Sequence, residues 1–398
     1  MRHVPRCFRA YLLIAWVSLA VAQKPDVEMA WKLIAQGQRD EAVALLRNLI
    51  REDPHNADTR LLLGSVLMES GQRAESIAQL REAVQLLPES AEAHNALGEA
   101  YNMFGDTAAA RPEFERAVEL DPRHAQAQAN LGAVLLQQNE PREAMPHLEQ
   151  AIRLFGRKPE AAYPRYLRAK IHNDQGDAAK AASELEQAVE LRPDFAEAWS
   201  DLGSARKSLS DEAGALLAFR RAVSLSPDDP VAQYRLGSEL FEIGAVHEAV
   251  DHLDAAVRLD ANNQPALNAL QRALRQDGQR ERAEAVKAKL ADMLRERDRA
   301  DQKMVAAFEL NNRGTELERA GDVRGALEKY RAALELLPEH VGIRTNVAVA
   351  LLKLGKWEEG ISQMREALRR DPGNTKLQKA LEDALRQAKA KGIVPARQ

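Results

Sequence analysis

The side chains most able to do chemistry are spread along the chain without the spacing that catalysis requires. The sequence holds nine histidines and 60 acidic residues. His247 and His252 lie five residues apart, which does not place them on one face of a helix as a spacing of four would. There is no glycine-rich phosphate loop, no His-Glu-x-x-His, no Gly-x-Ser-x-Gly and no cysteine pair. We therefore expect neither enzyme activity nor a bound cofactor or metal.

The remaining ionisable residues read as structural. His55 and His124 fall in turns between the repeated units described below, and His94 takes a packing position. Charges alternate along helix faces, as in Arg295-Glu296-Arg297-Asp298, a pattern typical of a solvated surface. The formal net charge is −4 and no basic block is present. This composition disfavours nucleic acid as a partner.

A constant period organises the chain. Gly64, Gly98 and Gly132 are spaced by 34, and so are Gly203 and Gly237. Further positions keep a constant distance from the glycine, and in the most regular copy, counted from Gly98, they are Gly105, Ala110, Phe114, Ala117 and Pro122. A fixed period in this range is typical of stacked-repeat proteins, in which each unit buries its apolar face against its neighbours.

Each repeated position has a physical reason. A glycine such as Gly98 inside a helix costs about 1 kcal/mol against alanine, so its recurrence predicts close approach of a second helix. Gly105 supplies a left-handed cap that ends the first helix, and Asp106 then serves as N-cap of the second. Pro122 ends the second helix, because the residue before proline disfavours the helical basin. Each unit is thus predicted to be two helices joined by a turn.

This pattern resembles the tetratricopeptide repeat family. Eight units match it well and two match more weakly, near Gln23 and Gln264, so that the resemblance covers about residues 23 to 390; the eight start near Ala57, Ala91, Ala125, Ala162, Ala196, Pro230, Ala307 and Val341. The resemblance implies an all-α fold, an α-solenoid in which helix pairs stack into a right-handed superhelix. Trp199 fills the family's aromatic position in the first helix, which other copies replace with His94, Gln128 or Arg60.

Two departures from the period predict the domain organisation. The interval from Gly132 to Gly203 exceeds two periods by three, and the excess falls in a turn at residues 156–159. The interval from Gly237 to Gly314 exceeds two periods by nine, and this excess falls between Gly278 and Ala307, where neither Gly nor Pro occurs. We expect one overlong, charged helix there, which either projects into solvent or acts as a hinge or docking spur. The predicted parts are a solenoid of about eight units over 23–306, rear units with a capping helix over 307–390, and a disordered tail over 391–398.

Residues 1–22 have the pattern of a secretory signal peptide. Arg2, Arg6 and Arg9 precede an apolar run that ends in Ala20-Val21-Ala22. The run is shorter than the roughly 20 residues of an ordinary membrane span, although an uncleaved anchor is the alternative. We expect an exported protein, periplasmic or secreted, with no membrane span after cleavage. The single cysteine, Cys7, would be removed with this segment.

The resemblance places a binding groove on the first helix of each unit. Polar and aromatic residues on the expected groove side are our candidate peptide-binding positions; they are Tyr163, Tyr166, Lys170, Asn173, Tyr234, Phe241, Asn311, Asn312, Thr315 and Asn346. Some family members hold a peptide backbone with an asparagine two residues before the first-helix glycine, and here only Asn312 and Asn346 do so in adjacent units. The tyrosines could instead pack against neighbouring helices.

These features favour an exported scaffold or adaptor that binds a protein or peptide along the concave groove. The alternative is a periplasmic platform subunit of an envelope machine, for polysaccharide export or pilus assembly, since arrays resembling this one serve there. An enzyme whose catalytic part lies on a partner chain is a third reading. The lysine and asparagine set by which some members bind chaperone tails is not found in register, which disfavours a co-chaperone role.

Overall fold

The computed structural model describes residues 25–393, and every regular element in that range is helical, which confirms the all-α prediction. The chain divides into two compact units, one ending at Gly278 and the other beginning at Gln279. Each unit is described by itself below.

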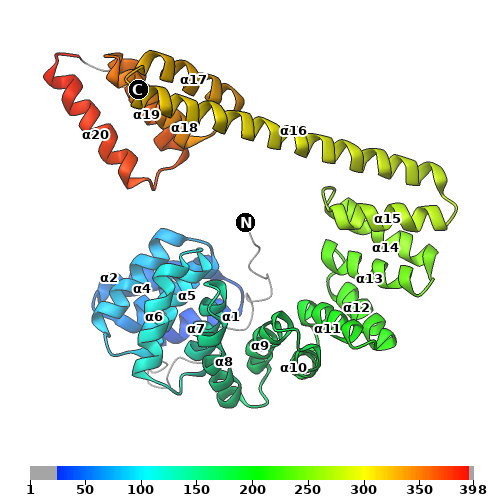
Figure 1. Cartoon of the computed structure of the whole chain (residues 1–398). Coiled ribbons are helices and arrows are strands. Elements are labelled where there is room, and N and C mark those ends of the chain that lie inside the picture. The colour runs from blue at the N-terminus through cyan, green and yellow to red at the C-terminus, as the bar shows by residue number, and fades with distance from the viewer. Residues whose placement is uncertain (1–24, 394–398) are drawn as a thin grey trace. The chain divides into compact units, whose positions relative to one another are not determined.

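Unit 1 consists of helices that alternate along the chain as first and second members of antiparallel pairs (Figure 1). The first helices are α1 (Pro25–Ala35), α3 (Ala57–Glu69), α5 (Ala91–Met103), α7 (Ala125–Gln137), α9 (Ala162–Asp174), α11 (Ala196–Ser208), α13 (Pro230–Glu242) and α15 (Gln264–Gln276). The second helices are α2 (Arg39–Glu52), α4 (Arg73–Leu86), α6 (Thr107–Leu120), α8 (Pro141–Phe155), α10 (Ala178–Leu191), α12 (Glu212–Leu225) and α14 (Val246–Leu259).

The first-helix glycine allows the two helices of a pair to pack closely. A Cβ atom added at Gly98 would lie 2.7 Å from the Phe114 ring, and one added at Gly203 would lie 2.5 Å from Phe219. In both pairs the contacting residue stands at the same distance along the chain from the glycine, and it is buried. Leucine takes the facing position in other pairs, as Leu80, Leu148 and Leu253 opposite glycine and as Leu185 opposite Ala169. The spacing found in the sequence is therefore a steric fit between facing helices.

The turn inside each pair uses left-handed backbone. Gly105 has φ +82° and Asp106 accepts a hydrogen bond from the Ala109 N–H, which confirms the expected glycine cap and aspartate N-cap. The same turn occurs without glycine at Asn139 (φ +64°) and Ser210 (φ +61°). A serine in this region is strained, because its Cβ crowds the following carbonyl. Ser210 therefore tolerates a conformation that the array geometry imposes.

A side-chain hydrogen bond ties the first helix to the turn between repeats. Trp199 donates its indole N–H to the carbonyl of Pro193, and Gln128 bonds to the Pro122 carbonyl in the same way. The same position makes this bond in other copies through Arg60, His94, Gln233, Arg344 and Gln378. In these copies the residue that replaces the family's aromatic side chain thus carries a nitrogen. The shared requirement is a partner for a carbonyl that helix termination leaves free.

Unit 1 differs in how closely successive first helices approach one another. First helices contact each other in the contact strip, formed by α3, α5, α7 and α9. In the open strip, formed by α9, α11 and α13, no comparable contact joins them. The strips meet at α9, which follows a short 3₁₀ turn, η3 (Pro159–Ala161), in the three-residue insertion. Successive second helices of the described unit make no extended contacts, so the first helices form the inner side of the array.

Unit 2 begins with a single helix of 40 residues, α16 (Arg280–Arg319). This helix includes both the segment without Gly or Pro and the residues around Gly314. It therefore runs without a break across residue 306, the predicted end of the first solenoid. The division of the chain lies earlier, at Gly278, because an unbroken helix offers no boundary. The other helices are α17 (Val323–Leu336), α18 (Val341–Lys353), α19 (Trp357–Arg370) and α20 (Thr375–Ala390).

The end of the described chain is more ordered than the expected tail 391–398. The Ile393 N–H donates to the Ala388 carbonyl, Ile393 packs in the cluster around Trp357, and Lys391 lies over the Trp357 ring. The rest of that tail and the expected signal peptide at residues 1–22 lie outside the described residues. Within residues 25–393, no helix combines the length and hydropathy needed to span a membrane.

Candidate functional site

The open strip contains a cavity of about 170 Å³ between the first helices of three successive repeats. Its lining includes Lys170 and Asn173 of α9, Asp201 and Ser204 of α11, and Arg235 of α13. Two of these, Lys170 and Asn173, were groove candidates from the sequence. The cavity lies where the first helices stand apart, so the opening and the polar lining coincide.

A polar network holds the helices of the open strip at this separation. Arg235 donates from Nη1 to Asp201 Oδ1 at 2.7 Å and to the buried Ser200 hydroxyl at 2.8 Å. Tyr166 donates its hydroxyl to Asp201 from the other side, and burial together with this carboxylate raises the pKa of Tyr166. Asp201 thus bridges α9 and α13. Large side chains occupy positions that are alanine at Ala96 and Ala129 in the contact strip.

The two candidate tyrosines of α9 pack inside the array. The Tyr163 and Tyr166 rings stack with centroids 6.4 Å apart, and Tyr166 meets the Phe195 ring at 4.9 Å. Both lie against hydrophobic core clusters, and burial raises the pKa of Tyr163 to about 12. Their packing shapes one wall of the open strip, as the sequence analysis allowed.

Lys170 and Asn173 are available side chains of the open strip, and the exposed carboxylate of Asp174 lies beside them in the cavity lining. Lys170 and Asn173 are both exposed, and within the described residues neither makes an ion pair or a side-chain hydrogen bond. The Lys170 ammonium lies 5.6 Å from the centroid of the Tyr166 ring, which places its charge at the cavity. An ammonium without an ion pair and an amide without a hydrogen-bond partner can bind carboxylate or peptide groups.

The contact strip carries a half-buried carboxylate, Glu99, on α5. Two buried amides donate to its Oε1: Asn130 at 2.8 Å and Asn95 at 3.2 Å. Asn130 also donates to Asn95 Oδ1 at 2.9 Å, which links α7 to α5. Glu99 Oε2 has no partner among the described residues and is not sealed from solvent. Burial raises the pKa of Glu99 to about 7, against the two amide hydrogen bonds, which lower it.

The asparagine candidates of unit 2 are largely used internally. Asn346 on α18 donates to Asn311 Oδ1 at 2.8 Å, and Thr315 bonds to the Asn311 carbonyl and accepts from Tyr330. Asn312 is exposed. The amide of Asn346 is therefore not oriented toward a ligand in this structure, and of the two adjacent asparagines only Asn312 presents its amide.

The last two candidates lie on α13 of unit 1. Phe241 packs beneath the Arg272 guanidinium of α15, 5.0 Å from its ring centroid, and Tyr234 is half-buried. Neither lines the cavity of the open strip. The structure thus brings Lys170 and Asn173 together, with Tyr166 behind them, and places Tyr234 and Phe241 on a neighbouring part of the first-helix side.

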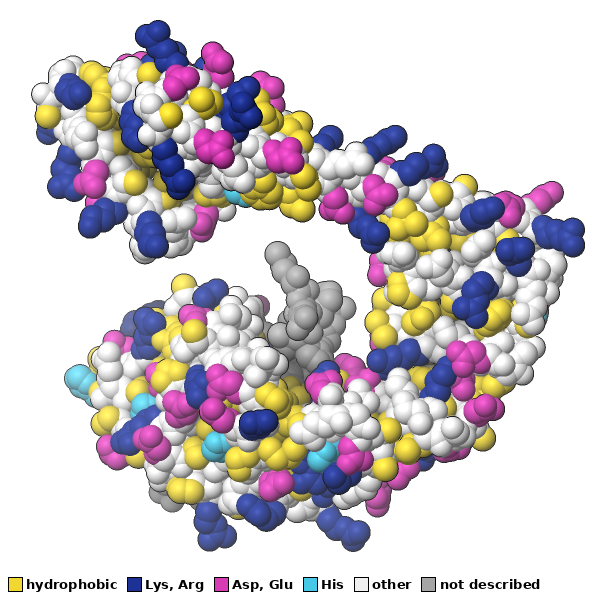
Figure 2. Space-filling view, in the orientation of Figure 1, with side chains coloured by type: hydrophobic (Ala, Val, Ile, Leu, Met, Phe, Trp, Pro, Cys, Tyr) yellow, Lys and Arg dark blue, Asp and Glu magenta, His cyan; other side chains and the backbone are white. Residues whose placement is uncertain are grey.

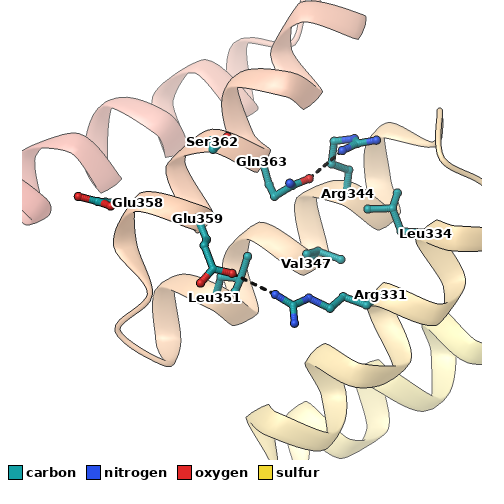
Figure 3. A pocket seen from close by; sticks show the side chains of 9 residues that line it. All are labelled: Arg331, Leu334, Arg344, Val347, Leu351, Glu358, Glu359, Ser362 and Gln363. Atoms are coloured by element: carbon teal, nitrogen blue, oxygen red, sulfur yellow. Dashed lines mark hydrogen bonds and ion pairs between the residues drawn. The ribbon is translucent and has the colours of Figure 1, made fainter. Parts of the chain in front are cut away.

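Unit 2 has a larger furrow of about 430 Å³ between α17, α18 and α19 (Figure 3). Its floor includes Val347 and Leu351, and the Arg331–Glu359 ion pair at 3.0 Å spans it. Ion pairs at equivalent positions of successive second helices, with the same separation in sequence, recur as Arg47–Glu75 and Arg220–Glu248. A furrow crossed by a recurring ion pair is a regular feature of repeat stacking, so it is the weaker candidate for a site.

Charges of both signs are interspersed on the visible face of each unit (Figure 2). No continuous basic surface is seen on that face, in agreement with the low net charge. The open strip is therefore distinguished by its cavity and its donors without hydrogen-bond partners, and not by a concentration of charge of one sign.

Sequence reasoning did not select Asp201, Ser204, Arg235 or Glu99. The sequence does hold a usable signal, which is the position of a residue relative to the first-helix glycine. Two residues of one repeat, three before and one after its glycine position, lie near one residue of the next repeat, two before the glycine position of that repeat. In the contact strip this rule gives Asn95, Glu99 and Asn130, and in the open strip it gives Tyr166, Lys170 and Asp201, then Ser200, Ser204 and Arg235. Considering these three positions together would have identified these groups of polar residues from the sequence.

Comparisons with known proteins agree with the fold. Family models described as tetratricopeptide repeat match residues 33–100, 89–157, 130–185, 166–230, 214–264 and 311–375. No curated protein matches the sequence. A structure from a functional characterization of PilF from Pseudomonas aeruginosa is similar, with TM-score 0.50, 18% identity, and 53% of this chain and 95% of that chain covered. A tetratricopeptide repeat protein from Parabacteroides merdae gives TM-score 0.47 and 14% identity, with 63% and 98% covered. YrrB, described as having an unusual peptide-binding site, gives TM-score 0.38 and 22% identity, with 47% and 95% covered.

Proposed function

Because the chain belongs to the tetratricopeptide repeat family, whose members bind protein or peptide partners, we propose that it is a non-catalytic interaction scaffold that binds a peptide segment across the open strip. The observation that carries this proposal is the cavity between α9, α11 and α13, which exposes Lys170 without an ion pair and Asn173 without a side-chain hydrogen bond among the described residues. In the contact strip, by contrast, the first helices touch, and the amides of Asn95 and Asn130 are used internally.

The open strip suits an extended segment for two reasons. Its first helices stand apart over three repeats, so a chain can cross them, and its fixed Asp201–Arg235 network needs no rearrangement to receive one. A preformed site avoids part of the entropic cost of ordering side chains on binding.

The test is selection of random dodecapeptides displayed on phage against the full chain. We expect enrichment over blank matrix, and loss of capture in Ser204→Trp, which fills the cavity. Ser224→Trp is the matched control, because Ser224 is exposed on the second helix α12. Circular dichroism verifies that both variants keep their helix content. Equal capture by wild type and Ser204→Trp would contradict the assignment of the site, and absence of enrichment would contradict peptide binding itself.

Export belongs to the same proposal and is supported by the pattern of residues 1–22. A periplasmic scaffold follows if that segment is cleaved, and a platform subunit of an envelope machine is the narrower alternative. Fractionation of the native host with an antibody against the chain tests the location: a band only in the cytoplasm would exclude both. Co-purification of export or pilus components from the envelope would favour the platform alternative.

A further inference from the structure

The inner side of unit 1 carries two side chains of opposite charge at equivalent positions of different repeats. Their charges predict which charged side chains a bound partner has. Glu99 on α5 and Lys170 on α9 each follow the first-helix glycine position by one residue, two repeats apart. Within the described residues, neither Glu99 Oε2 nor the Lys170 ammonium forms an ion pair or a hydrogen bond with the protein. We propose that the partner is an extended segment with a lysine or arginine seated at Glu99 and an acidic side chain seated at Lys170. This inference rests on the proposed peptide-binding function.

Glu99, Asn95 and Asn130 form a group, called here the Glu99 cell, in which one carboxylate oxygen is left without a partner among the described residues. The buried amides of Asn95 and Asn130 both donate to Oε1, which orients the carboxylate and leaves Oε2 toward solvent. No cation within the described residues forms an ion pair with Glu99, whereas the nearby Glu92 is paired with His124 at 3.0 Å. A half-buried carboxylate without a counter-ion is electrostatically unfavourable, so a cationic side chain from outside would relieve it.

Lys170 and Asn173, with the cavity residues around them, form a second group of opposite charge, called here the Lys170 cell. Two acids line the cavity with Lys170: Asp201 is already bonded by Arg235 and Tyr166, and Asp174 on α9 forms no ion pair with Lys170. Asn173 lies three residues further along the same exposed face of α9 and adds a second donor. Between the two cells, the equivalent positions hold the buried apolar residues Ala129, Ala133 and Leu167, which offer no side-chain hydrogen bond to a partner.

The separation of the two charges sets the spacing in the partner. Adjacent packed helices lie about 8–10 Å apart, so two steps from α5 through α7 to α9 span roughly 20 Å. An extended chain rises about 3.3 Å per residue, which corresponds to about six residues. The partner segment therefore carries its opposite charges about six positions apart.

Protonation adds a second signature at the acidic cell. With a pKa of about 7, Glu99 is partly protonated near neutrality. The charged groups that act on it are Glu92 on the same helix, which raises the pKa, and His124, the N-cap residue of α7, which lowers it. A bound cation favours the ionised form, so binding of a cationic segment releases a proton and weakens as the pH falls below 7.

The experiment repeats the peptide selection with three forms of the full chain: wild type, Glu99→Gln and Lys170→Glu. The glutamine is isosteric and can accept the same amide hydrogen bonds. We expect wild type to enrich peptides with opposite charges about six residues apart, Glu99→Gln to lose the cationic preference, and Lys170→Glu to lose the acidic one. A synthetic peptide from the wild-type pool should bind Glu99→Gln about tenfold more weakly at pH 8, whereas Glu149→Gln, a carboxylate change on the second helix α8, should leave binding unchanged.

The outcomes separate this inference from the proposed function. Peptides enriched equally by all three forms, with no charge preference and with capture still lost in Ser204→Trp, would overturn the charge assignment and leave the groove intact. Peptides that keep their cationic preference on Glu99→Gln would overturn the acidic cell alone. No enrichment with any form would overturn peptide binding, and the charge assignment with it.

Discussion

The contact strip and the open strip of unit 1 use the same repeat and differ in three positions of the first helix. On α5 and α7 of the contact strip, the positions two and three before the glycine hold only alanine or asparagine, the first helices touch, and Asn95 and Asn130 bond to each other. In the open strip Tyr166, Asp201 and Arg235 occupy them, the helices stand apart and a cavity remains. The difference shows that side chains on the inner side, and not the helix hairpin itself, decide whether neighbouring repeats close or leave a groove.

The first prediction tests that the hairpins are equivalent in the two strips. Gly98→Val in the contact strip and Gly203→Val in the open strip each place methyl groups against a buried phenylalanine, Phe114 or Phe219. Both should lower the free energy of unfolding by about 3 kcal/mol, the range for overpacking a core. Urea denaturation followed by circular dichroism measures it. A loss confined to one strip would show that the strips differ within repeats as well as between them.

The second prediction contrasts the carboxylates of the two strips. Glu99 has a pKa of about 7 in the folded chain against an ordinary value of 4.5, so the folded state holds its proton more tightly and stability falls as pH rises between these values. Glu99→Gln removes this loss and should be about 2 kcal/mol more stable than wild type at pH 8, with little difference below pH 5. Thermal unfolding across that range measures it.

The matched change in the open strip should have the opposite sign. Asp201→Asn weakens the pair with Arg235 and should lower stability by about 1 kcal/mol at pH 8. If both variants shift stability in the same direction, the two strips do not differ in how they satisfy their carboxylates.

Much of the fold could be predicted because it depends on local chemistry. Gly98 against Phe114, the left-handed turn at Gly105 and the Asp106 cap each involve one repeat, so periodic spacing reveals them. The site depends on pairs in different repeats, such as Arg235 with Asp201. Whether Tyr166 lines a groove or fills a core is set by helix separation, which spacing along the chain does not carry.

The third prediction concerns the hydrogen bond to the inter-repeat turn, which both strips share. Gln128→Leu in the contact strip leaves the Pro122 carbonyl without its donor, and Trp199→Phe does the same to Pro193 in the open strip. Trp199→Phe should lower stability by about 1 kcal/mol, typical of one lost hydrogen bond, and Gln128→Leu by more, because Gln128 Oε1 also bonds to His147 Nδ1. Denaturant midpoints measure both. A neutral Trp199→Phe would mean that ring packing alone explains the aromatic position.

The smallest expected effect is a gain in stability at the turn inside a pair. Ser210 adopts φ +61° in the open strip and Asn139 adopts φ +64° in the contact strip, where the other pairs of the repeat place glycine. Ser210→Gly should raise stability by roughly 0.5–1 kcal/mol, because glycine has no Cβ to strain in this region. Asn139→Gly should gain less, since asparagine tolerates the left-handed conformation better. Melting temperatures of the two variants rank them, and a destabilising Ser210→Gly would show that the serine side chain contributes more to this turn than its strain removes.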